Sequence, residues 1–525
     1  MRTLPELHGT RVSHVKRWAN FHHTIVDREV AAYLTPGGNG FPVGVSSGAA
    51  LTGCLNEILD YCQQKPPQRL CVIGSRWSLS NILDPGEVIL DPGAWNQMAL
   101  VNAAWITPDC TQELSVNQGV PVVVQGGVTI AAVNRVLGEA NLALQTSGAN
   151  DGHRFAGAIA TGTHGSHPKV GAVHDTVLAM LLVTGPNQAV LVQPTKRRFT
   201  SDLTEWFCQQ TTLPVSDLAD DELFAAAQVS LGGLGFVHSV IIEAVPLYEL
   251  VGQSVARPLF DTDVWDAMAR LDATALGGPA EPDFFSVVLS PFARKGNGSF
   301  AAWLSKQVPS KPYAPPGPGQ ARIATDLSRL LSSLIPHVDH GLTAGLIEKI
   351  IVDQTSAQYG AGKNGPSFPG SAFGPTPLPE GNGRSVEVVV DHVQTGPATK
   401  LVIETLQQEG KAGRHLLGGI GVRFAPKTNA LLGMNIHAMN TYIEFPSLGS
   451  NDTSTIHEAV WTALRSAQIP FTCHWGQEYG MDNASLRSYF GDRVDRWKAA
   501  RHVLLPTAAA RAVFTNPLIE QLGLD

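Results

Sequence analysis

The spacing of apolar residues predicts regular elements throughout the first half of the chain. Residues 48–64 place Leu51, Leu55 and Leu59 on one side of a helix, because these positions recur every four residues. Shorter apolar runs rich in β-branched residues predict strands, and one hairpin turns at residues 185–188. The strands are expected at 69–74, 87–91, 120–127, within 172–195 and within 224–248, with a second helix at 129–142.

The pattern of apolar and polar residues changes after Pro258. Helical patterns alternate with strands, and two stretches contain too much proline and glycine to hold a regular ladder, so they predict loops. The helices are expected at 264–274, 322–335, 396–408 and 453–467, the strands at 418–426 and 440–446, and the loops at 308–320 and 360–383.

The length of 525 residues exceeds what one core can hold, since single cores stop growing at roughly 250–300 residues. We place the main domain boundary near residue 250, close to the point where the pattern of apolar and polar residues changes. The expected organisation is an N-terminal extension at 1–40, a first domain at 41–250, a second domain at 251–470 and a C-terminal segment at 471–525.

Composition and charge narrow the classes of partner. Hydrophobic residues make up 43% of the chain and charged residues 16%, which excludes a disordered protein. The net charge of −8 and the absence of a long basic run argue against nucleic acid and against an acidic membrane surface. A small molecule is therefore the expected partner, and the sequence leaves the oligomeric state open.

Cysteine usage indicates a reducing compartment. The six cysteines form no CxxC pair and no zinc spacing, so we expect free thiols. Residues 1–20 contain no apolar signal region, and no stretch of 18 apolar residues occurs, so neither secretion nor membrane spanning is expected. The expected location is the cytoplasm.

The densest glycine stretch, residues 145–166, is the main candidate for ligand binding. Glycines at this density let backbone amides approach a flat or phosphorylated ligand closely, and the nearby hydroxyl groups can donate hydrogen bonds. Taken alone, the stretch is equally compatible with a tight loop between strands.

Together with VIGSRWSLSN (72–81) and SLGGLGFV (230–237), the segment GAIATGTHGS (157–166) resembles the FAD-binding domain of the vanillyl-alcohol oxidase and p-cresol methylhydroxylase (PCMH-type) superfamily, in particular its sugar-lactone and alditol oxidase branch. The resemblance covers roughly residues 42–248. It implies an α+β fold in which a two-subdomain FAD-binding domain occupies 41–250. A cap domain built on an antiparallel sheet follows at 251–470, and the C-terminal segment returns to the flavin.

The same resemblance implies which residues hold FAD. In the family the first loop wraps the diphosphate, the second segment lies along the flavin and ribityl chain, and the later strand reaches the adenine side. The loop corresponds to Gly74, Ser75, Arg76, Trp77 and Ser78, the second segment to Gly148, Gly157, Thr161, Gly162, Thr163, His164 and Gly165, and the strand to Gly235 and Val237.

One departure concerns the attachment of the cofactor. Relatives in this branch commonly carry in the first loop a histidine that is joined covalently to the flavin, and Trp77 stands at that position here. An indole cannot replace the imidazole as the linking nucleophile. The resemblance therefore implies FAD that is bound without this covalent bond.

The second half supplies candidates for catalysis. The strand at 418–426 resembles a cap strand whose arginine faces the flavin, here Arg423, and the segment that ends in a lysine in the sugar oxidases ends in Gln477. A glutamate often precedes the arginine by two positions, and Gly421 stands there instead. This incomplete polyol-binding set favours a less polar substrate, such as an intermediate of secondary metabolism or a sterol-like alcohol.

Hydride transfer to a flavin needs a substrate C–H bond near N5, an acceptor for the departing proton and positive charge beside the reduced ring. Arg423 is the candidate for substrate alignment or charge stabilisation, His474 for contact with substrate or flavin, and Glu387 for the base. Each has an ordinary alternative: a surface charge on a strand for Arg423, a structural histidine for His474 and a solvated strand residue for Glu387.

Three other patterns are set aside. Residues 44–48 match GxSxG, but a helix cap explains the serines and no histidine–acid set in hydrolase order accompanies them. His164, His167 and His174 lack ligand spacing for a metal, so no metal is expected. The glycines at 232–235 precede a strand rather than a helix, which disfavours a nicotinamide site.

The sequence thus predicts an FAD-dependent oxidoreductase that oxidises a CH–OH group, or another activated C–H bond, of a small organic molecule by hydride transfer to flavin N5. Dioxygen is the expected electron acceptor. The alternatives are a dehydrogenase that passes electrons to another carrier and a non-catalytic binding protein that keeps the flavin fold.

Overall fold

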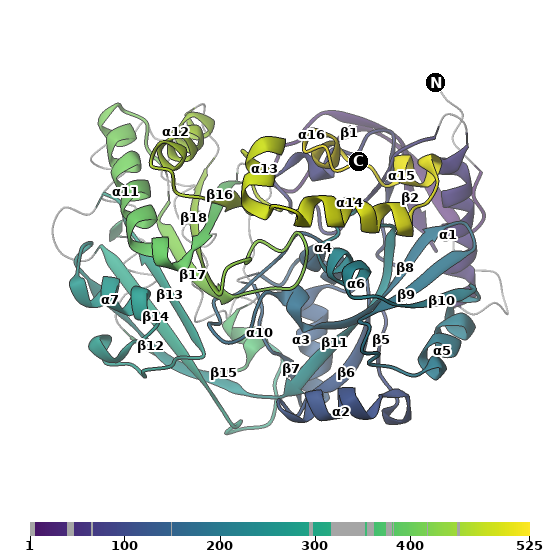
Figure 1. The fold of residues 1–525 in the computed structure, drawn as a ribbon, viewed down its shortest axis with the longest axis horizontal. Helices are drawn as coiled ribbons and strands as arrows, with labels where there is room; N and C mark the ends of the chain where they lie inside the picture. The colour runs from purple at the N-terminus through teal and green to yellow at the C-terminus, as the bar shows by residue number, and fades with distance from the viewer. Residues whose placement is uncertain are drawn as a thin grey trace.

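The computed structural model describes residues 6–38, 47–64, 67–148, 150–292, 298–316, 352–353, 362–373, 381, 383–416, 418–448 and 452–525. The helix expected at 322–335 lies outside these residues, as do residues 317–320 and 374–380 of the two expected loops. The remaining elements form two halves, with the N-terminal half and the C-terminal cap side by side (Figure 1).

The N-terminal half begins with a four-stranded sheet in the order β1-β2-β4-β3. Helix α1 packs on it through an apolar face that includes Leu51, Leu55 and Ile58, as the spacing predicts. The elements are β1 Thr10–Trp18, β2 Arg28–Pro36, α1 Ser47–Gln63, β3 Leu70–Val72 and β4 Val88–Leu90. Because the β1–β2 hairpin pairs with β4, residues 10–36 belong to this sheet rather than to a separate extension.

A seven-stranded sheet in the order β10-β9-β8-β11-β6-β5, with β7 also paired to β11, completes this half. Its central strand β8, Val177–Gly185, is buried at every position, which explains its unbroken apolar run. The other strands are β5 Met98–Leu100, β6 Val120–Gln125, β7 Leu142–Leu144, β9 Gln188–Gln193, β10 Val215–Ala219 and β11 Phe236–Pro246. The helices are α2 Pro108–Ser115, α3 Ile130–Glu139, α4 Phe155–Ala160, α5 Ser201–Thr211 and α6 Asp221–Gln228.

The cap is an eight-stranded sheet in the order β15-β12-β14-β13-β17-β18-β16-β19, backed by helices. Every pairing in it is antiparallel, as expected for this half. The strands are β12 Glu249–Arg257, β13 Phe284–Leu289, β14 Ser299–Gln307, β15 Gly362–Ser367, β16 Gly383–Asp391, β17 Ile420–Pro426, β18 Met439–Leu448 and β19 Thr472–Cys473. The helices are α7 Thr262–Arg270, α10 Pro369–Ala372, α11 Thr395–Lys411 and α12 Thr453–Ser466.

The chain ends with helices that leave the cap and lie over the N-terminal half, drawn in yellow in Figure 1. They are α13 Asn483–Phe490, α14 Arg493–Leu504, α15 Ala508–Val513 and α16 Pro517–Gln521. Helix α14 is tied to the N-terminal half because buried Arg501 donates to the Gly233 carbonyl and Arg496 pairs with Glu222. The last 50 residues therefore link the two halves.

Two expected assignments are wrong. Residues 224–228 were expected in a strand but belong to helix α6, which begins where the Asp220 carboxylate accepts from the amides of Glu222 and Leu223. A short apolar run cannot by itself distinguish strand from helix. Residues 360–383 were expected to form a loop, yet they contain β15 at the edge of the cap sheet, where a proline is tolerated, and the short helix α10.

All six cysteines are free thiols, as expected. Within the described residues, no helix has the length and apolar character needed to cross a bilayer.

Candidate active site

The loop that follows β3 lines a deep cavity in the N-terminal half. This N-terminal cavity holds about 1110 Å³ of empty space, including space open to solvent. The amides of Ser75, Trp77 and Ser78 donate no hydrogen bond to any described residue. Such a row of exposed amides is typical of a site for an anionic group. The sequence-predicted residues on its wall are Gly74, Ser75, Arg76, Trp77, Ser78, Gly157, Thr161, Gly235 and Val237.

Two glycines give this cavity its depth. A Cβ built on Gly74 would meet no atom nearer than Arg154 Cβ at 3.9 Å, and one on Gly157 would approach only Gly74 Cα at 3.9 Å. Side chains at these positions would therefore project toward the cavity. The backbone of the loop and the start of α4 are thus accessible to a ligand.

A second cavity lies between the two halves and holds about 990 Å³ of empty space, including space open to solvent. This interface cavity shares Trp77, Ser78, His153 and Thr161 with the N-terminal cavity, so the two adjoin. Its wall brings together further predicted residues from both halves, which are Gly148, Thr163, His164, Glu387, Arg423, His474 and Gln477.

Two predicted cofactor residues lie outside both cavities. Gly165 lines a third, smaller cavity, which also touches His164 and Arg423. Gly162 has a φ of +75°, and a Cβ there would meet Met434 Cε at 2.7 Å. The need for glycine at position 162 therefore comes from backbone conformation and packing against Met434, rather than from direct approach to a ligand.

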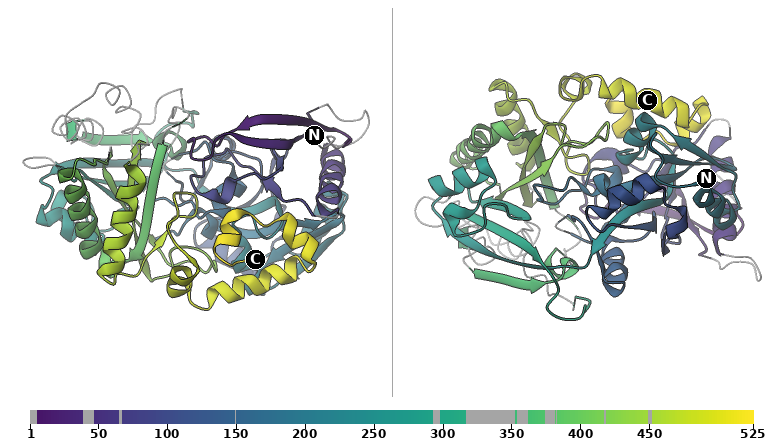
Figure 2. Two further views of the ribbon diagram at one scale, coloured as in Figure 1. Left: turned by 90° about the horizontal axis from the view of Figure 1, so that it is seen from above. Right: turned by 60° about the horizontal axis from the view of Figure 1, so that its bottom comes forward.

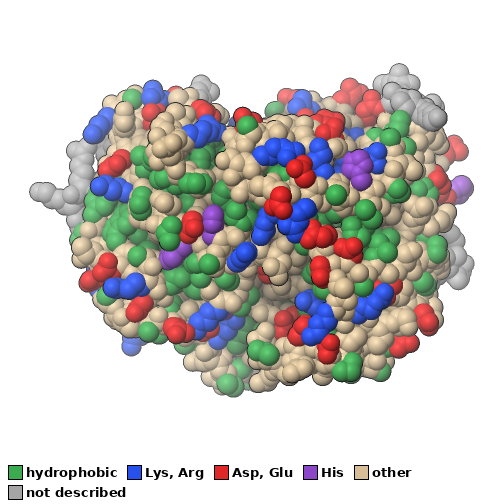
Figure 3. All heavy atoms as spheres, in the orientation of Figure 1, with side chains coloured by type: hydrophobic (Ala, Val, Ile, Leu, Met, Phe, Trp, Pro, Cys, Tyr) green, Lys and Arg blue, Asp and Glu red, His purple; other side chains and the backbone are tan. Residues whose placement is uncertain are grey.

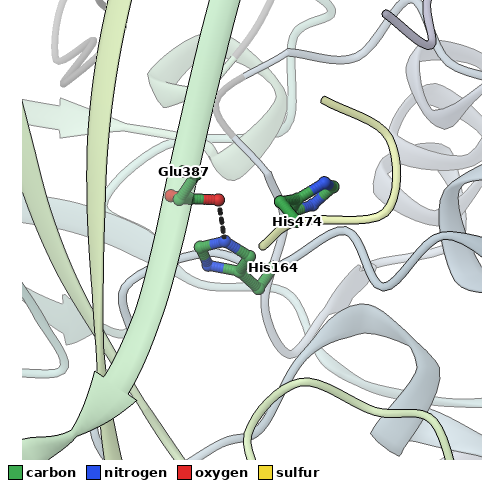
Figure 4. A group of neighbouring side chains, drawn as sticks. All are labelled: His164, Glu387 and His474. Carbon is green, nitrogen blue, oxygen red and sulfur yellow. Dashed lines mark hydrogen bonds and ion pairs between the residues drawn. The ribbon is translucent and has the colours of Figure 1, made fainter. Parts of the chain in front are cut away.

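Buried charges on the cap sheet form the centre of the interface cavity. Glu387 on β16 lies with Oε1 3.1 Å from Arg423 Nη1 and Oε2 2.9 Å from His164 Nε2. Figure 4 shows the His164 ring and the Glu387 carboxylate pointing at each other, with His474 beside them. Glu387 is 1% exposed and Arg423 8%, which rules out the surface-charge alternatives for both.

The charges beside Glu387 determine its ionisation state. Burial alone would raise the pKa of Glu387, but the charges of His164 and Arg423 outweigh burial and lower the pKa to about 2. Glu387 is therefore ionised at neutral pH. His164 Nε2 lies at hydrogen-bond distance from Glu387 Oε2, and its Nδ1 lies 2.8 Å from the Gly165 carbonyl oxygen, so both ring nitrogens face oxygen atoms.

His474 is held differently. Its Nδ1 accepts from the Gly476 amide at 3.0 Å, and its own amide donates to the Glu387 carbonyl at 2.9 Å. Burial lowers the pKa of His474 to about 4, so the ring is neutral at pH 7. It is the one predicted catalytic residue in this set that combines a neutral, titratable side chain with a place on the cavity wall.

Sequence reasoning missed Glu444. This residue on β18 lies directly opposite both Gly421 on β17 and Glu387 on β16. Its Oε2 is 2.7 Å from Arg423 Nη1, so the guanidinium is shared by two carboxylates. The Gln477 side-chain amide donates to Glu444 Oε1 at 3.0 Å. The carboxylate that is absent at position 421 is thus supplied by the neighbouring strand, which only the strand pairing could reveal.

His164, Glu387 and His474 also have one potential metal-ligand atom each within 4.8 Å of one another. The carboxylate, however, already pairs with the guanidinium of Arg423 and lies 2.9 Å from His164 Nε2. A cation added here would lie beside the positive charge of Arg423. We therefore interpret the three residues as a hydrogen-bonded cluster.

The comparisons with known proteins agree with this geometry. Residues 53–191 match the family described as FAD binding domain. The L-gulono-1,4-lactone dehydrogenase of Mycobacterium tuberculosis is 22% identical over 86% of this chain and 90% of its own length. The cholesterol oxidase of B. sterolicum has the same fold, with a TM-score of 0.71 and 12% identity over 99% of this chain and 100% of that one. These comparisons support the PCMH-type flavoprotein family and indicate FAD as the cofactor.

This flavoprotein is an FAD-dependent oxidoreductase, and its relatives lie in the sugar-lactone branch. Another is the D-arabinono-1,4-lactone oxidase of Candida glabrata, 26% identical over 28% of this chain. That match spans about a quarter of the oxidase, 24% of its length. The α+β fold with an antiparallel cap, expected from the sequence, is confirmed.

The residues present fit FAD. The amides of Ser75, Trp77 and Ser78 suit a diphosphate, and the glycine pair leaves room for a ligand that approaches the backbone. Trp77 packs against Phe21 and His153, with ring centroids 5.0 and 4.6 Å away, in the wall common to both cavities.

On the face shown in Figure 3, charged side chains of both signs are interspersed, and no basic stripe suited to nucleic acid is seen there.

Proposed function

We propose that this flavoprotein oxidises a CH–OH group of a small hydroxylated molecule to a carbonyl group. When bound, FAD supplies the acceptor at N5 for the hydride that leaves the substrate carbon. The observation that carries the proposal is the buried group of Glu387, Arg423 and His474, which shares a cavity wall with the loop proposed to bind the cofactor. A non-catalytic flavin-fold protein would have no need for buried charges at this position.

Arg423, His474 and Glu387 have different roles in the proposed oxidation of an alcohol. The guanidinium of Arg423 is held in place by Glu387 and Glu444, so its orientation is fixed before a substrate arrives. Its positive charge on the cavity wall suits a substrate oxygen. The neutral His474 ring carries its proton on Nε2, because Nδ1 accepts from the Gly476 amide, so it takes up the hydroxyl proton at Nδ1 in place of that hydrogen bond. Glu387 has its pKa lowered to about 2 and is a poor base. Glu387 is therefore a positioning residue.

A polar substrate fits the cavity wall better than the sterol-like alcohol expected from the sequence. The expectation rested on the glycine at 421 and the missing lysine at 477. Glu444 restores a carboxylate beside Arg423, and Gln477, Ser385 and Arg384 add polar groups to the same wall. We propose a polyhydroxylated substrate, the class to which the lactones named for the relatives belong.

Dioxygen is the proposed electron acceptor. A carrier other than dioxygen is the second candidate, because the relative that matches most of this chain is named a dehydrogenase. Mixing the protein anaerobically with aldonolactones, alditols and apolar alcohols, and then admitting air, separates these possibilities. We expect the flavin band to bleach with a hydroxylated compound and to recover in air within seconds.

Slow recovery in air would indicate a dehydrogenase, and bleaching only by apolar alcohols would refute the polar substrate. No bleaching by any compound would favour the binding protein. His474→Gln should slow bleaching about 100-fold, since general bases contribute factors of this order. His502→Gln is the matched control, because His502 is exposed on α14. Equal rates for both variants would remove His474 from the mechanism.

A further inference from the structure

The connection between β1 and β2, residues 19–27, packs directly on the loop proposed to bind the FAD diphosphate. The Phe21 amide donates to the Arg76 carbonyl at 2.8 Å, and Arg76 Nη1 donates to the Ala19 carbonyl at 3.0 Å. The Asn20 side-chain amide donates to the Ser78 carbonyl at 2.8 Å. Three consecutive residues of the connection thus bind the loop at two of its carbonyls and at one of its side chains.

Thr24 extends this pattern by donating to the Leu79 carbonyl at 3.0 Å. The loop carbonyls at 76, 78 and 79 are therefore all engaged by the β1–β2 connection. In a trans peptide the carbonyl and the following amide point to opposite sides, so the bond to the Arg76 carbonyl directs the Trp77 amide away from the connection. The Leu79 amide, which shares a peptide with the Ser78 carbonyl, donates to the Gly476 carbonyl instead. The connection therefore fixes the direction of the Trp77 amide, to which an anion is attracted.

Aromatic packing strengthens the contact. The Phe21 and Trp77 rings are stacked, with centroids 5.0 Å apart and planes at 24°. On its other side Trp77 meets the His153 ring edge to face at 4.6 Å. Trp77 is the position where relatives with a covalent flavin carry the linking histidine, so the ring that replaces it is fixed by the N-terminal connection.

The loop needs this support because its backbone is strained. Arg76 has a φ of +63°, in the left-handed region that side chains other than glycine rarely adopt. Both of the Arg76 bonds described above come from residues 19–21 of the connection. Without them the loop would relax toward ordinary backbone angles and lose the arrangement of its amides.

The connection also reaches the cap. The Gly381 amide donates to the Phe21 carbonyl at 2.8 Å, and His22 lines the interface cavity. In the view from above in Figure 2, the purple hairpin extends across the N-terminal half toward the cap. One short segment therefore contacts the diphosphate loop, the active-site cavity and the cap.

We propose that residues 19–27 form a clasp that retains FAD by holding the loop at 75–79 in its binding conformation. The inference goes beyond the proposed reaction and rests only on FAD binding at that loop. Because binding and clasp formation are linked, FAD must stabilise the clasp to the same extent that the clasp stabilises FAD binding. The apparent affinity falls by the fraction of molecules in which the clasp is open.

Phe21→Ala tests the proposal by titration of the FAD-free protein with FAD. We expect the dissociation constant to rise roughly tenfold, as aromatic pairs and their buried area predict. Phe21→Tyr keeps the ring and should bind FAD normally. Phe260→Ala is the matched control, since it removes one ring of the stacked pair formed by Phe260 and Trp265 of α7 and should leave the dissociation constant unchanged.

Hydrogen–deuterium exchange supplies a readout that requires no activity. We expect FAD to slow exchange of the peptide containing residues 19–27 in the wild type, with a smaller effect in Phe21→Ala. If Phe21→Ala does not fold, Thr24→Val is the second variant. It removes the hydroxyl that donates to the Leu79 carbonyl and accepts from the Asn20 side-chain amide, and it should still weaken binding. Unchanged affinity in folded Phe21→Ala or Thr24→Val, or hydrogen–deuterium exchange at 19–27 that is the same with and without FAD, would overturn the clasp. Neither result depends on whether a substrate reduces the flavin.

Discussion

Replacement of Arg423 by alanine tests the centre of the site most directly. The guanidinium lies 3.1 Å from one carboxylate and 2.7 Å from another, and it is 8% exposed. Removing one partner of a buried ion pair costs about 3–5 kcal/mol, because the remaining charge is left uncompensated. Here Glu387 and Glu444 would face each other across the vacated space. We therefore expect Arg423→Ala to destabilise the protein by at least about 3 kcal/mol, and not to affect turnover alone.

Urea unfolding followed by flavin and tryptophan fluorescence measures this loss. Arg496→Ala is the matched control, because the Arg496–Glu222 pair is exposed at the surface and such pairs contribute about 1 kcal/mol or less. A second substitution, Glu444→Gln, should recover part of the stability in the Arg423→Ala background, since it removes one of the two unpaired charges. Stopped-flow reduction should remain slower by about 100-fold in both variants, because the group that orients the substrate oxygen is absent.

Two results would refute this reasoning. An Arg423→Ala protein as stable as the Arg496→Ala control would show that the carboxylates are not held by the guanidinium. Turnover at the wild-type rate in a folded Arg423→Ala variant would remove Arg423 from the mechanism and leave substrate alignment to other groups on the cavity wall.

Three further predictions follow from the same structure. FAD should be released by acid precipitation, since Trp77 cannot form the histidyl bond of the relatives; yellow colour that stays in the pellet would contradict this. Gly162→Val should prevent folding, because it combines a φ of +75° with a contact to Met434 Cε at 2.7 Å, and a soluble variant with normal thermal stability would disprove it. Stability should fall as the pH drops from about 6.5 toward 4, because burial lowers the pKa of His238 and of His474 from 6.5 to about 4, so the unfolded chain binds more protons in this range. Protonation of each of these histidines should lower the free energy of unfolding by up to about 3 kcal/mol. In His238→Gln the denaturation midpoint should therefore depend less steeply on pH.

Local sequence patterns were sufficient for most of the fold, whereas the cofactor role of the loop at 74–78 was predicted from the family resemblance. The helix at α1 and the strands on either side of this loop depend on neighbours within about 20 residues, so apolar spacing reveals them. The same logic failed for α6, because its apolar run is too short to show a period and only the cap formed by Asp220 distinguishes it. A short stretch of sequence can predict a helix or a strand, but not the helix or strand with which it packs or pairs.

The contacts of the β1–β2 connection could not be predicted from the sequence. Nothing in residues 19–27 indicates ligand binding, and the segment seemed to belong to an extension outside the domain. Its role appears only when the sheet order places β2 beside β4, which brings Phe21 onto a loop more than 50 residues later in the chain. Contacts of this kind are set by sheet topology, which hydrophobic patterning constrains only weakly.

The carboxylate beside Arg423 makes the same point for chemistry. A motif describes positions along one strand, so the glycine at 421 indicates that an acid is missing. Side chains directly opposite on paired antiparallel strands lie about 5 Å apart, closer than many neighbours along a chain. Glu444 is opposite Gly421, and a carboxylate on either strand reaches the guanidinium two positions further on. Site chemistry is therefore a property of the sheet face, and a motif that is broken in the sequence can be complete in the fold.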